Sequence, residues 1–205
     1  MAQQGIYVDI SNYDQVCKHL RKVPKDIAIG LKRANINLKR QAQTVVRTEV
    51  SRVYNVKKKD VSKKKPDVKP AQTISLAGVS IPFYSMAYTG ARMSPTHFGM
   101  TPRARPSATP PFVHGRKAAR NYQVRWKPLR AGGREVLASD SGLPAFIATA
   151  FGGTTAFVRQ GPEPYGIDSI RRLSVPQMIT NDKVSPQIQS EIEKRVEKEL
   201  ARIMK

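Results

Sequence analysis

Leu143-Pro-Ala-Phe-Ile-Ala-Thr-Ala-Phe-Gly-Gly-Thr-Thr-Ala-Phe-Val-Arg-Gln160 is the stretch of this chain that indicates its fold most directly. Two apolar runs, Ala145–Phe151 and Thr155–Val158, flank Gly152-Gly153, and such a glycine pair tolerates the positive φ angles of tight hairpin turns. Successive side chains of a strand point to opposite faces, so both faces of the first run carry apolar bulk. We therefore predict a hairpin at the centre of a single core, covered on one side by a helix.

Two long helices are predicted from apolar residues that recur every three or four positions. The first extends from Pro24 to about Tyr54, and its stripe consists of Ile27, Leu31, Ala34, Leu38, Ala42, Val45 and Val53. The second begins at Pro186, with Ser185 as the expected N-cap. Its stripe consists of Ile188, Ile192, Val196, Leu200 and Ile203. Glu191 and Arg195 are spaced for an ion pair within this helix.

Shorter segments predict strands because apolar and polar residues alternate in them. These segments are residues 5–10, 73–76, 79–88, 122–129 and 167–173. Pro82 indicates the edge or the start of a strand. A short helix after Ser11 or Asn12 would bury Cys17. The predicted fold class is α+β, with a small, mostly antiparallel sheet flanked by the long helix of the N-terminal half and by the C-terminal helix.

Charge is distributed very unevenly along the sequence. The 205 residues carry a formal net charge of +21 at pH 7. Residues 1–134 contain 27 Lys and Arg but only 6 Asp and Glu, whereas residues 135–205 contain 9 of each kind. Such a basic field favours a polyanion as partner, either nucleic acid or an acidic protein surface. The alternative is that the charge serves only solubility.

Two basic segments are the candidate contacts with such a partner. Residues 57–65 contain six lysines, and repulsion among them predicts a polar helix or loop that is not packed. Residues 94–120 contain five prolines and predict a projecting loop, inserted in the sheet of a single domain that spans residues 1–205. The candidate contact residues are Lys57, Lys58, Lys59, Lys63, Lys64, Lys65, Arg103, Arg105, Arg116, Lys117 and Arg120. The lysine run could equally be a solvated connector, whereas the loop suits an arm that reaches another subunit or nucleic acid.

Basic and aromatic residues also alternate in residues 122–127. Tyr122, Val124 and Trp126 fall on one face of the expected strand, and Gln123, Arg125 and Lys127 fall on the other. Interleaved aromatic and basic side chains are typical of nucleic-acid platforms. Here the two kinds lie on opposite faces, so we favour an ordinary half-buried strand.

The sequence shows no pattern for catalysis or for binding a cofactor or a metal. His19, His97 and His114 lie far apart, and Cys17 is the single cysteine, so neither a metal-ligand set nor an intrachain disulfide is predicted. No glycine-rich phosphate-binding loop occurs. No apolar run approaches the ~20 residues that span a bilayer, and the N-terminus lacks a secretory signal. We predict a protein made inside the cell that is not an enzyme, has no cofactor and does not associate with membranes.

Four stretches of the chain, in their order, carry a family resemblance. They are the long helix through residues 31–42 and 50–61, the strand at 81–84, the strand at 123–126, and the series 145–148, 156–159 and 167–178. In this order they resemble the minor tail protein Z family of tailed bacteriophages, whose members are also called tail completion proteins. The Pro-rich loop departs from the family pattern by its length, so no role for it follows from the resemblance.

The resemblance implies a structural virion protein made in the host cytoplasm, with a sheet flanked by helices. It implies a place in the neck, at the head-proximal end of the viral tail, where head–tail joining and DNA passage occur. The implied partners are the tail terminator, the tail tube and the head connector. Tail symmetry implies a homo-oligomeric, hexameric ring around the DNA path. The basic excess would suit acidic partner rings or the DNA end held in the channel.

A different class of function is consistent with the same residues. The chain could be a basic accessory protein that binds nucleic acid as a free monomer, through residues 57–65 and 103–120. Such a protein would bind DNA tightly and with a steep dependence on salt. A nuclease would need several carboxylates near two metal ions, and acidic residues are sparse before residue 135. A DNA-processing enzyme is therefore the least favoured interpretation.

Overall fold

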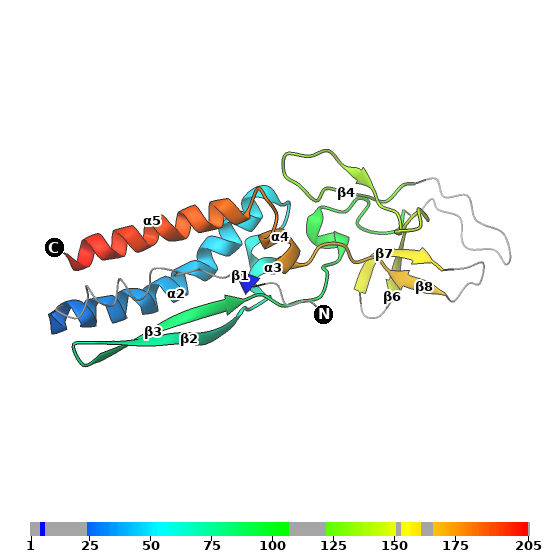
Figure 1. Ribbon diagram of the computed structural model, residues 1–205. Helices are drawn as coiled ribbons and strands as arrows, with labels where there is room; N and C mark the ends of the chain where they lie inside the picture. The colour runs from blue at the N-terminus through cyan, green and yellow to red at the C-terminus, as the bar shows by residue number, and fades with distance from the viewer. Residues whose placement is uncertain (1–4, 7–23, 107–121, 151–152, 161–165, 205) are drawn as a thin grey trace. The chain divides into compact units, whose positions relative to one another are not determined.

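The computed structural model describes residues 5–6, 24–106, 122–150, 153–160 and 166–204, and these form two compact units (Figure 1). Unit 1 comprises residues 1–50, 62–90 and 175–205, and unit 2 comprises residues 51–61 and 91–174, each within the described ranges. The predicted α+β class is confirmed by a long helix in the N-terminal half, a C-terminal helix and small antiparallel sheets. The expectation of a single domain stays a prediction.

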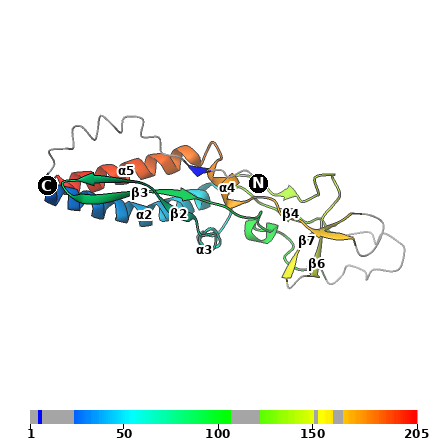
Figure 2. The ribbon, with the colours of Figure 1, turned by 60° about the horizontal axis from the view of Figure 1, so that its bottom comes forward.

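Unit 1 is built from two long antiparallel helices and a hairpin. Its elements are β1 (Gly5–Ile6), α2 (Lys25–Val53, with its last three residues in unit 2), β2 (Asp67–Leu76), β3 (Val79–Ala87), α4 (Val175–Ile179) and α5 (Ser185–Ile203). Figures 1 and 2 both show α5 beside α2, running in the opposite direction. The Arg195 guanidinium donates to Gln41 Oε1 at 2.9 Å and links the two helices.

Helix α2 confirms the first predicted helix at both ends. Pro24 precedes its first residue, and the Pro24 carbonyl accepts a hydrogen bond from the Ala28 amide at 3.1 Å. A proline here costs no backbone hydrogen bond, because the first amides of a helix have no partner within it. Ala34 and Val45 of the predicted stripe are buried, and the buried Val50 extends the stripe toward the end of the helix.

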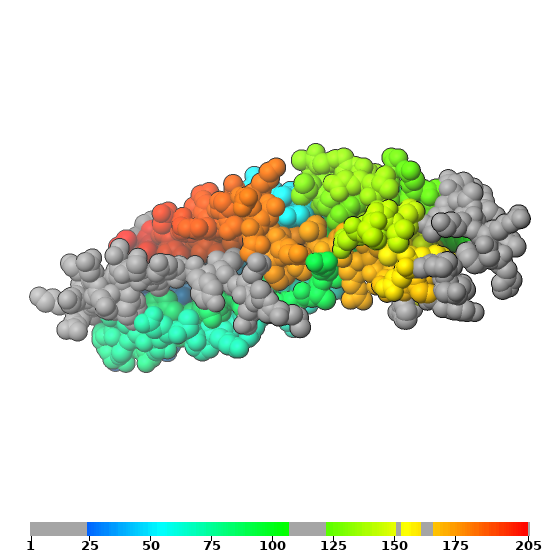
Figure 3. Space-filling view, turned by 45° about the vertical axis from the view of Figure 1, so that its right-hand side comes forward, coloured from blue at the N-terminus to red at the C-terminus, as the bar shows by residue number. Residues whose placement is uncertain are grey.

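Helix α5 confirms the second predicted helix but corrects two details. Val184, not Ser185, is the N-cap, and no side chain caps the helix. The reason is a preceding turn in which the amides of Val184 and Ser185 both bond to the Asn181 carbonyl, so Ser185 is already helical. Glu191 pairs with Lys194 at 3.0 Å rather than with the predicted partner, Arg195. Figure 3 shows residues of α5, in orange and red, at the molecular surface.

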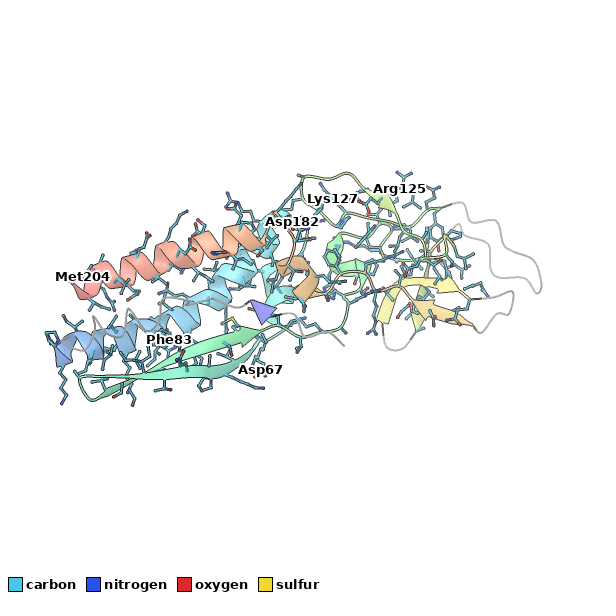
Figure 4. The ribbon with its side chains drawn as sticks, viewed as in Figure 1. Asp67, Phe83, Arg125, Lys127, Asp182 and Met204 are labelled. Atoms are coloured by element: carbon cyan, nitrogen blue, oxygen red, sulfur yellow. The ribbon has the colours of Figure 1, made fainter. Side chains whose placement is uncertain are left out.

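The hairpin of β2 and β3 packs its apolar face against α2. Ala77 and Gly78 form the turn, with φ angles of 48° and 75°, which match the two left-handed positions of a type I′ turn. Leu76 and Ile81 form a buried cluster with Ala28 of α2. The partly buried residues around this cluster are Leu31, Ile74, Val79 and Phe83, and Figure 4 labels Phe83 on β3. Burial of these side chains fixes the hairpin on the helix.

Polar contacts fix the same hairpin along α2. The Asn35 side-chain amide donates to the Pro82 carbonyl, and Lys39 Nζ lies 4.3 Å from the centre of the Tyr84 ring. Among the described residues, β1 pairs only with Met86 and Ala87 of β3, so it does not reach Pro82. β3 is the middle strand of this sheet, in the order β1-β3-β2, and Pro82 lies inside it, so the predicted edge position of this proline stays a prediction.

Unit 2 consists mainly of strands. Its elements are α3 (Lys58–Ser62, with its last residue in unit 1), η1 (Pro95–Phe98, a 3₁₀ helix), β4 (Arg125–Trp126), β5 (Glu135–Val136), β6 (Phe146–Ala150), β7 (Gly153–Arg159) and β8 (Ile167–Ser169). The predicted hairpin is confirmed as β6 paired with β7, with Ile147 opposite Ala156, and β8 pairs with the other edge of β7. β4 and β5 form a separate sheet, so the strands do not make the one sheet that the sequence predicts.

Residues 94–100 correct the prediction of a projecting loop that begins at Ser94. Pro95, Phe98 and Met100 are buried in unit 2. Ser94 is the N-cap of η1, and its hydroxyl is hydrogen-bonded to the hydroxyl of Thr155 on β7. The short helix that contacts the central hairpin is therefore part of the segment expected to project. A proline at the start of a helix and an aromatic three residues later pack well despite the basic surroundings. Residues 107–121 lie outside the described part of the chain.

Gly99→Ala is predicted to destabilise unit 2 more than Gly142→Ala. Both glycines have left-handed φ angles, 67° and 78°, where any Cβ costs about 1–2 kcal/mol. Only at Gly99 would the Cβ also meet another group, Asn55 Nδ2 at 2.8 Å, which donates to the Phe98 carbonyl. We expect an extra loss of about 1 kcal/mol in the free energy of unfolding, measured by urea denaturation. Equal losses, or an extra loss that persists when Asn55 is replaced by alanine, would contradict this contact.

Burial raises the pKa of Tyr88 to about 12 from the ordinary 10.0, against the opposing charge of Arg47. Below pH 10 this side chain is neutral in both the folded and the unfolded state. Between pH 10 and about 12 only the unfolded state ionises, so the stability of unit 1 should fall as pH rises through this window. Urea denaturation of the protein and of Tyr88→Phe at several pH values checks this. The variant should lose less stability across the window, and parallel curves would contradict the burial.

Candidate functional site

The lysine run surrounds α3, which is packed through its other residues. Lys57 precedes the helix, Lys58 and Lys59 lie in it, and residues 63–65 follow it. Five of these six lysines are exposed, whereas Val56, Asp60 and Val61 are buried, which corrects the prediction of an unpacked segment. The apolar residues hold the segment while the long lysine side chains reach water. Lys57–Lys59 belong to unit 2 and Lys63–Lys65 to unit 1.

Asp60 provides the acidic anchor of this segment. Its carboxylate is almost fully buried, and Oδ2 lies 3.2 Å from His97 Nδ1 of η1. A buried carboxylate must be paired or hydrogen-bonded, and the contact with His97 meets this need in the interior of unit 2.

The candidate arginines of the predicted loop are only partly described. Arg103 and Arg105 are exposed residues of unit 2, shortly after the buried Met100. The other three candidates, Arg116, Lys117 and Arg120, lie outside the described residues. Of the described candidates, Lys57–Lys59, Arg103 and Arg105 belong to unit 2 and Lys63–Lys65 to unit 1.

A different basic surface is built on β4, and its geometry follows from the side of the strand that is buried. Val124 and Trp126 point into unit 2 and are 1% and 8% exposed. The Trp126 ring meets the ring of Phe98 edge-on, with centroids 5.6 Å apart and planes at 83°. Aromatic pairs favour this arrangement because the positive edge of one ring faces the negative face of the other. The buried pair fixes the rotation of β4, so Arg125 must face outward.

The backbone of Arg125 is held from both sides. Its amide donates to the Thr101 carbonyl at 2.8 Å and its carbonyl accepts from the Thr101 amide at 2.7 Å. On the other side Arg125 is opposite Val136 of β5. The strand that presents Arg125 is therefore the middle one of three extended segments and is well fixed.

We define the Arg125 face as Arg125 together with four other residues of the outward side. The five residues are Thr101, Arg125, Lys127, Arg134 and Val136. Lys127 and Arg134 are each two positions from a paired residue, which places them on the same side of their strands. The Arg134 guanidinium confirms this, since it crosses the face to donate to the Thr101 hydroxyl. Figure 4 labels Arg125 and Lys127, and Figure 3 shows the segment with β4 and β5 at the surface.

Among the described residues, no ion pair joins a carboxylate to the positive charges of the Arg125 face. The sequence has no acidic residue between Asp67 and Glu135. Glu135 is opposite Trp126, so its side chain leaves the strand on the other side. Asp140 is paired with Arg172. Within the described ranges, Arg125, Lys127 and Arg134 have no carboxylate partner, although the Arg125 guanidinium donates to Gln123 Oε1 at 3.1 Å.

Sequence reasoning recognised the alternation in this strand but not the site. The alternation correctly predicts Gln123, Arg125 and Lys127 on the outer face, but it favours an ordinary half-buried strand. Arg134 was not a candidate, because its pairing with Thr101 joins residues 33 positions apart. The usable signal was the absence of acidic residues from 68 to 134. It indicated that cations on any outward face in this range would lack local partners.

A comparison of the chain with protein-family models, with curated proteins and with solved structures finds no match. Over the described ranges, no group of three or more His, Cys, Asp and Glu side chains is placed to hold a metal ion. None of the helices in those ranges is both long enough and apolar enough to cross a membrane. The family resemblance, the absence of catalysis and the absence of cofactors therefore stay predictions.

Phe98→Ala is predicted to lower the free energy of unfolding of unit 2 by about 3–5 kcal/mol, the usual cost of removing a buried aromatic ring. Trp126 is the single tryptophan of the chain, so its fluorescence during urea denaturation reports on this unit. Val136→Ala is the control, because this side chain is 52% exposed and should cost little. Similar losses in the two variants would contradict the claim that the buried side of β4 fixes the orientation of the strand.

Proposed function

We propose that the chain is a structural virion protein of a tailed phage, a tail completion or neck protein at the head-proximal end of the tail. In this role it takes part in head–tail joining and in the passage of DNA. It acts as a homo-oligomeric, hexameric ring that meets the tail terminator, the tail tube and the head connector. It is made in the host cytoplasm and then becomes part of the particle, and it has no catalytic step.

The observation that carries the proposal is the order of the elements along the chain. The resemblance to the tail protein Z family rests on four stretches, and all four coincide with regular elements or lead directly into them. Residues 31–42 lie in α2, and residues 50–61 run from its last turn into α3. Residues 81–84 lie in β3, residues 123–126 lead into β4, and the last series overlaps β6, β7, β8 and α4. The α+β class with a long early helix and a C-terminal helix is the architecture that the resemblance implies.

The physical properties of the two units support the same role. A ring subunit needs rigid parts, and the α2–α5 pair with its hairpin is stabilised by both apolar and polar contacts. It also needs surfaces for charged neighbours, and the lysines around α3 and the Arg125 face offer such surfaces. Complementary charge steers the assembly of partners and fixes their register.

A second candidate function is a basic accessory protein that binds nucleic acid outside the particle. The Arg125 face favours it, because three cations without a carboxylate partner among the described residues lie together on one fixed surface. The two candidates differ in where the chain is found. The first places it in every infectious particle, and the second places it only in the infected cell.

The proposal predicts that particles assembled without this chain are defective at the neck. Heads and tails should both form, and electron microscopy should show them separate or joined without infectivity. Purified wild-type particles should contain the chain, and native mass spectrometry of the isolated protein or neck should give a hexamer.

A complementing copy with Gly142→Ala is a suitable control, because it alters one turn and leaves both basic surfaces unchanged. The proposal is wrong if the chain is absent from particles purified through a density gradient. It is also wrong if particles lacking the chain are fully infectious.

A further inference from the structure

We propose that the Arg125 face is a binding surface for the phosphate backbone of duplex DNA, with Arg125, Lys127 and Arg134 as the phosphate-binding residues. None of these three cations belongs to the lysine run or to residues 94–120, which were the candidate segments from sequence. It rests on the proposed function to the extent that the tail channel would supply the DNA, but it is tested with the purified chain alone.

The chemistry of the face fits phosphate groups. A guanidinium presents paired N–H donors in one plane and binds two oxygens of a phosphate at once. Arg125 and Lys127 are two residues apart, about 7 Å along an extended strand, so they can engage different phosphates. The Thr101 hydroxyl, which accepts from Arg134, adds a neutral donor of the kind that also contacts phosphates.

The rigid mounting of the face matters as much as its charge. Arg125 is held through its backbone by Thr101 and Val136, and the other side of β4 is buried through Trp126. Cations on such a support lose little backbone entropy on binding, unlike cations on a loop. The surface is therefore organised for a ligand before the ligand arrives.

The composition of the face favours DNA over an acidic protein surface. Protein interfaces have a core depleted in charged residues, with aromatic or aliphatic anchors at the centre. On this face the aromatic Trp126 points inward, and Val136 is the single apolar member among three cations and a hydroxyl. A polar, positively charged surface is typical of contacts with the nucleic-acid backbone, which do not depend on sequence.

The experiment measures binding of the full chain to a short fluorescein-labelled DNA duplex by anisotropy, at salt concentrations from about 0.05 to 0.2 M. The test variant carries Arg125→Glu, Lys127→Glu and Arg134→Glu. The control variant carries Lys32→Glu, Arg33→Glu and Arg40→Glu on the exposed side of α2, which removes the same kinds and number of cations. The test variant should bind at least about tenfold more weakly than the control at equal salt.

The salt dependence gives a second readout. Loss of three phosphate contacts should reduce the slope of log K against log salt by about 3, whereas the control should change it less. The neutral variant Arg125→Gln, Lys127→Gln, Arg134→Gln repeats the test without new negative charge, and circular dichroism of each variant checks folding. The proposal is overturned if test and control variants bind alike, or if polyglutamate competes for the wild type as well as unlabelled duplex does.

The outcome is independent of the location of the chain. A chain that is absent from particles but loses DNA binding in the test variant would refute the neck function and support the Arg125 face. If the chain is present in particles but the test variant binds DNA like the control variant, the neck function is supported and the Arg125 face is refuted.

Discussion

The edge-to-face contact between Phe98 and Trp126 is the interaction on which the outer surface of unit 2 depends. It joins a short helix to a strand that lies far along the sequence, and it fills the space behind β4. Because one side of a strand is then buried, the residues between the buried positions must face water. Arg125 is outside for this reason. Apolar packing on the inner side of β4 therefore determines which charged side chains lie on the outer surface.

In unit 1, apolar and polar contacts also have different roles. The apolar cluster around Ala28, Leu76 and Ile81 attaches the hairpin to α2, and the Asn35 amide fixes its position through the Pro82 carbonyl. Hydrophobic burial has no preferred direction, whereas a hydrogen bond to one carbonyl specifies register. Lys39 over the Tyr84 ring shows how a basic residue of α2 can support the structure, because its charge lies against an aromatic face.

Local signals in the sequence were sufficient for the regular elements. The 3.6-residue periodicity located α2 and α5, and the glycine pair with its flanking apolar runs located β6 and β7. What failed depended on contacts between distant residues. Residues 94–100 are rich in features of a loop, yet Phe98 packs because Trp126 is available to receive it. Asp60 is buried in a lysine-rich run because His97 lies beside it.

The candidate site was harder to predict than the fold for the same reason. Residues 57–65 are predicted as contacts because a run of lysines is evident from the sequence alone. The Arg125 face has only two cations close in sequence, and the third is brought to it by pairing of β4 with β5 and by the contact of Arg134 with Thr101. Tertiary pairing of this kind has no signature in a window of sequence.

We propose that this chain meets DNA in the neck of the particle through a face fixed by the Phe98–Trp126 contact. The most direct measurement is electron cryo-microscopy of the assembled head–tail junction at side-chain resolution. The account predicts a ring of this chain around the DNA path, with Arg125, Lys127 and Arg134 turned toward the DNA. A junction in which that face is covered by protein, or in which the chain has no place, would contradict it.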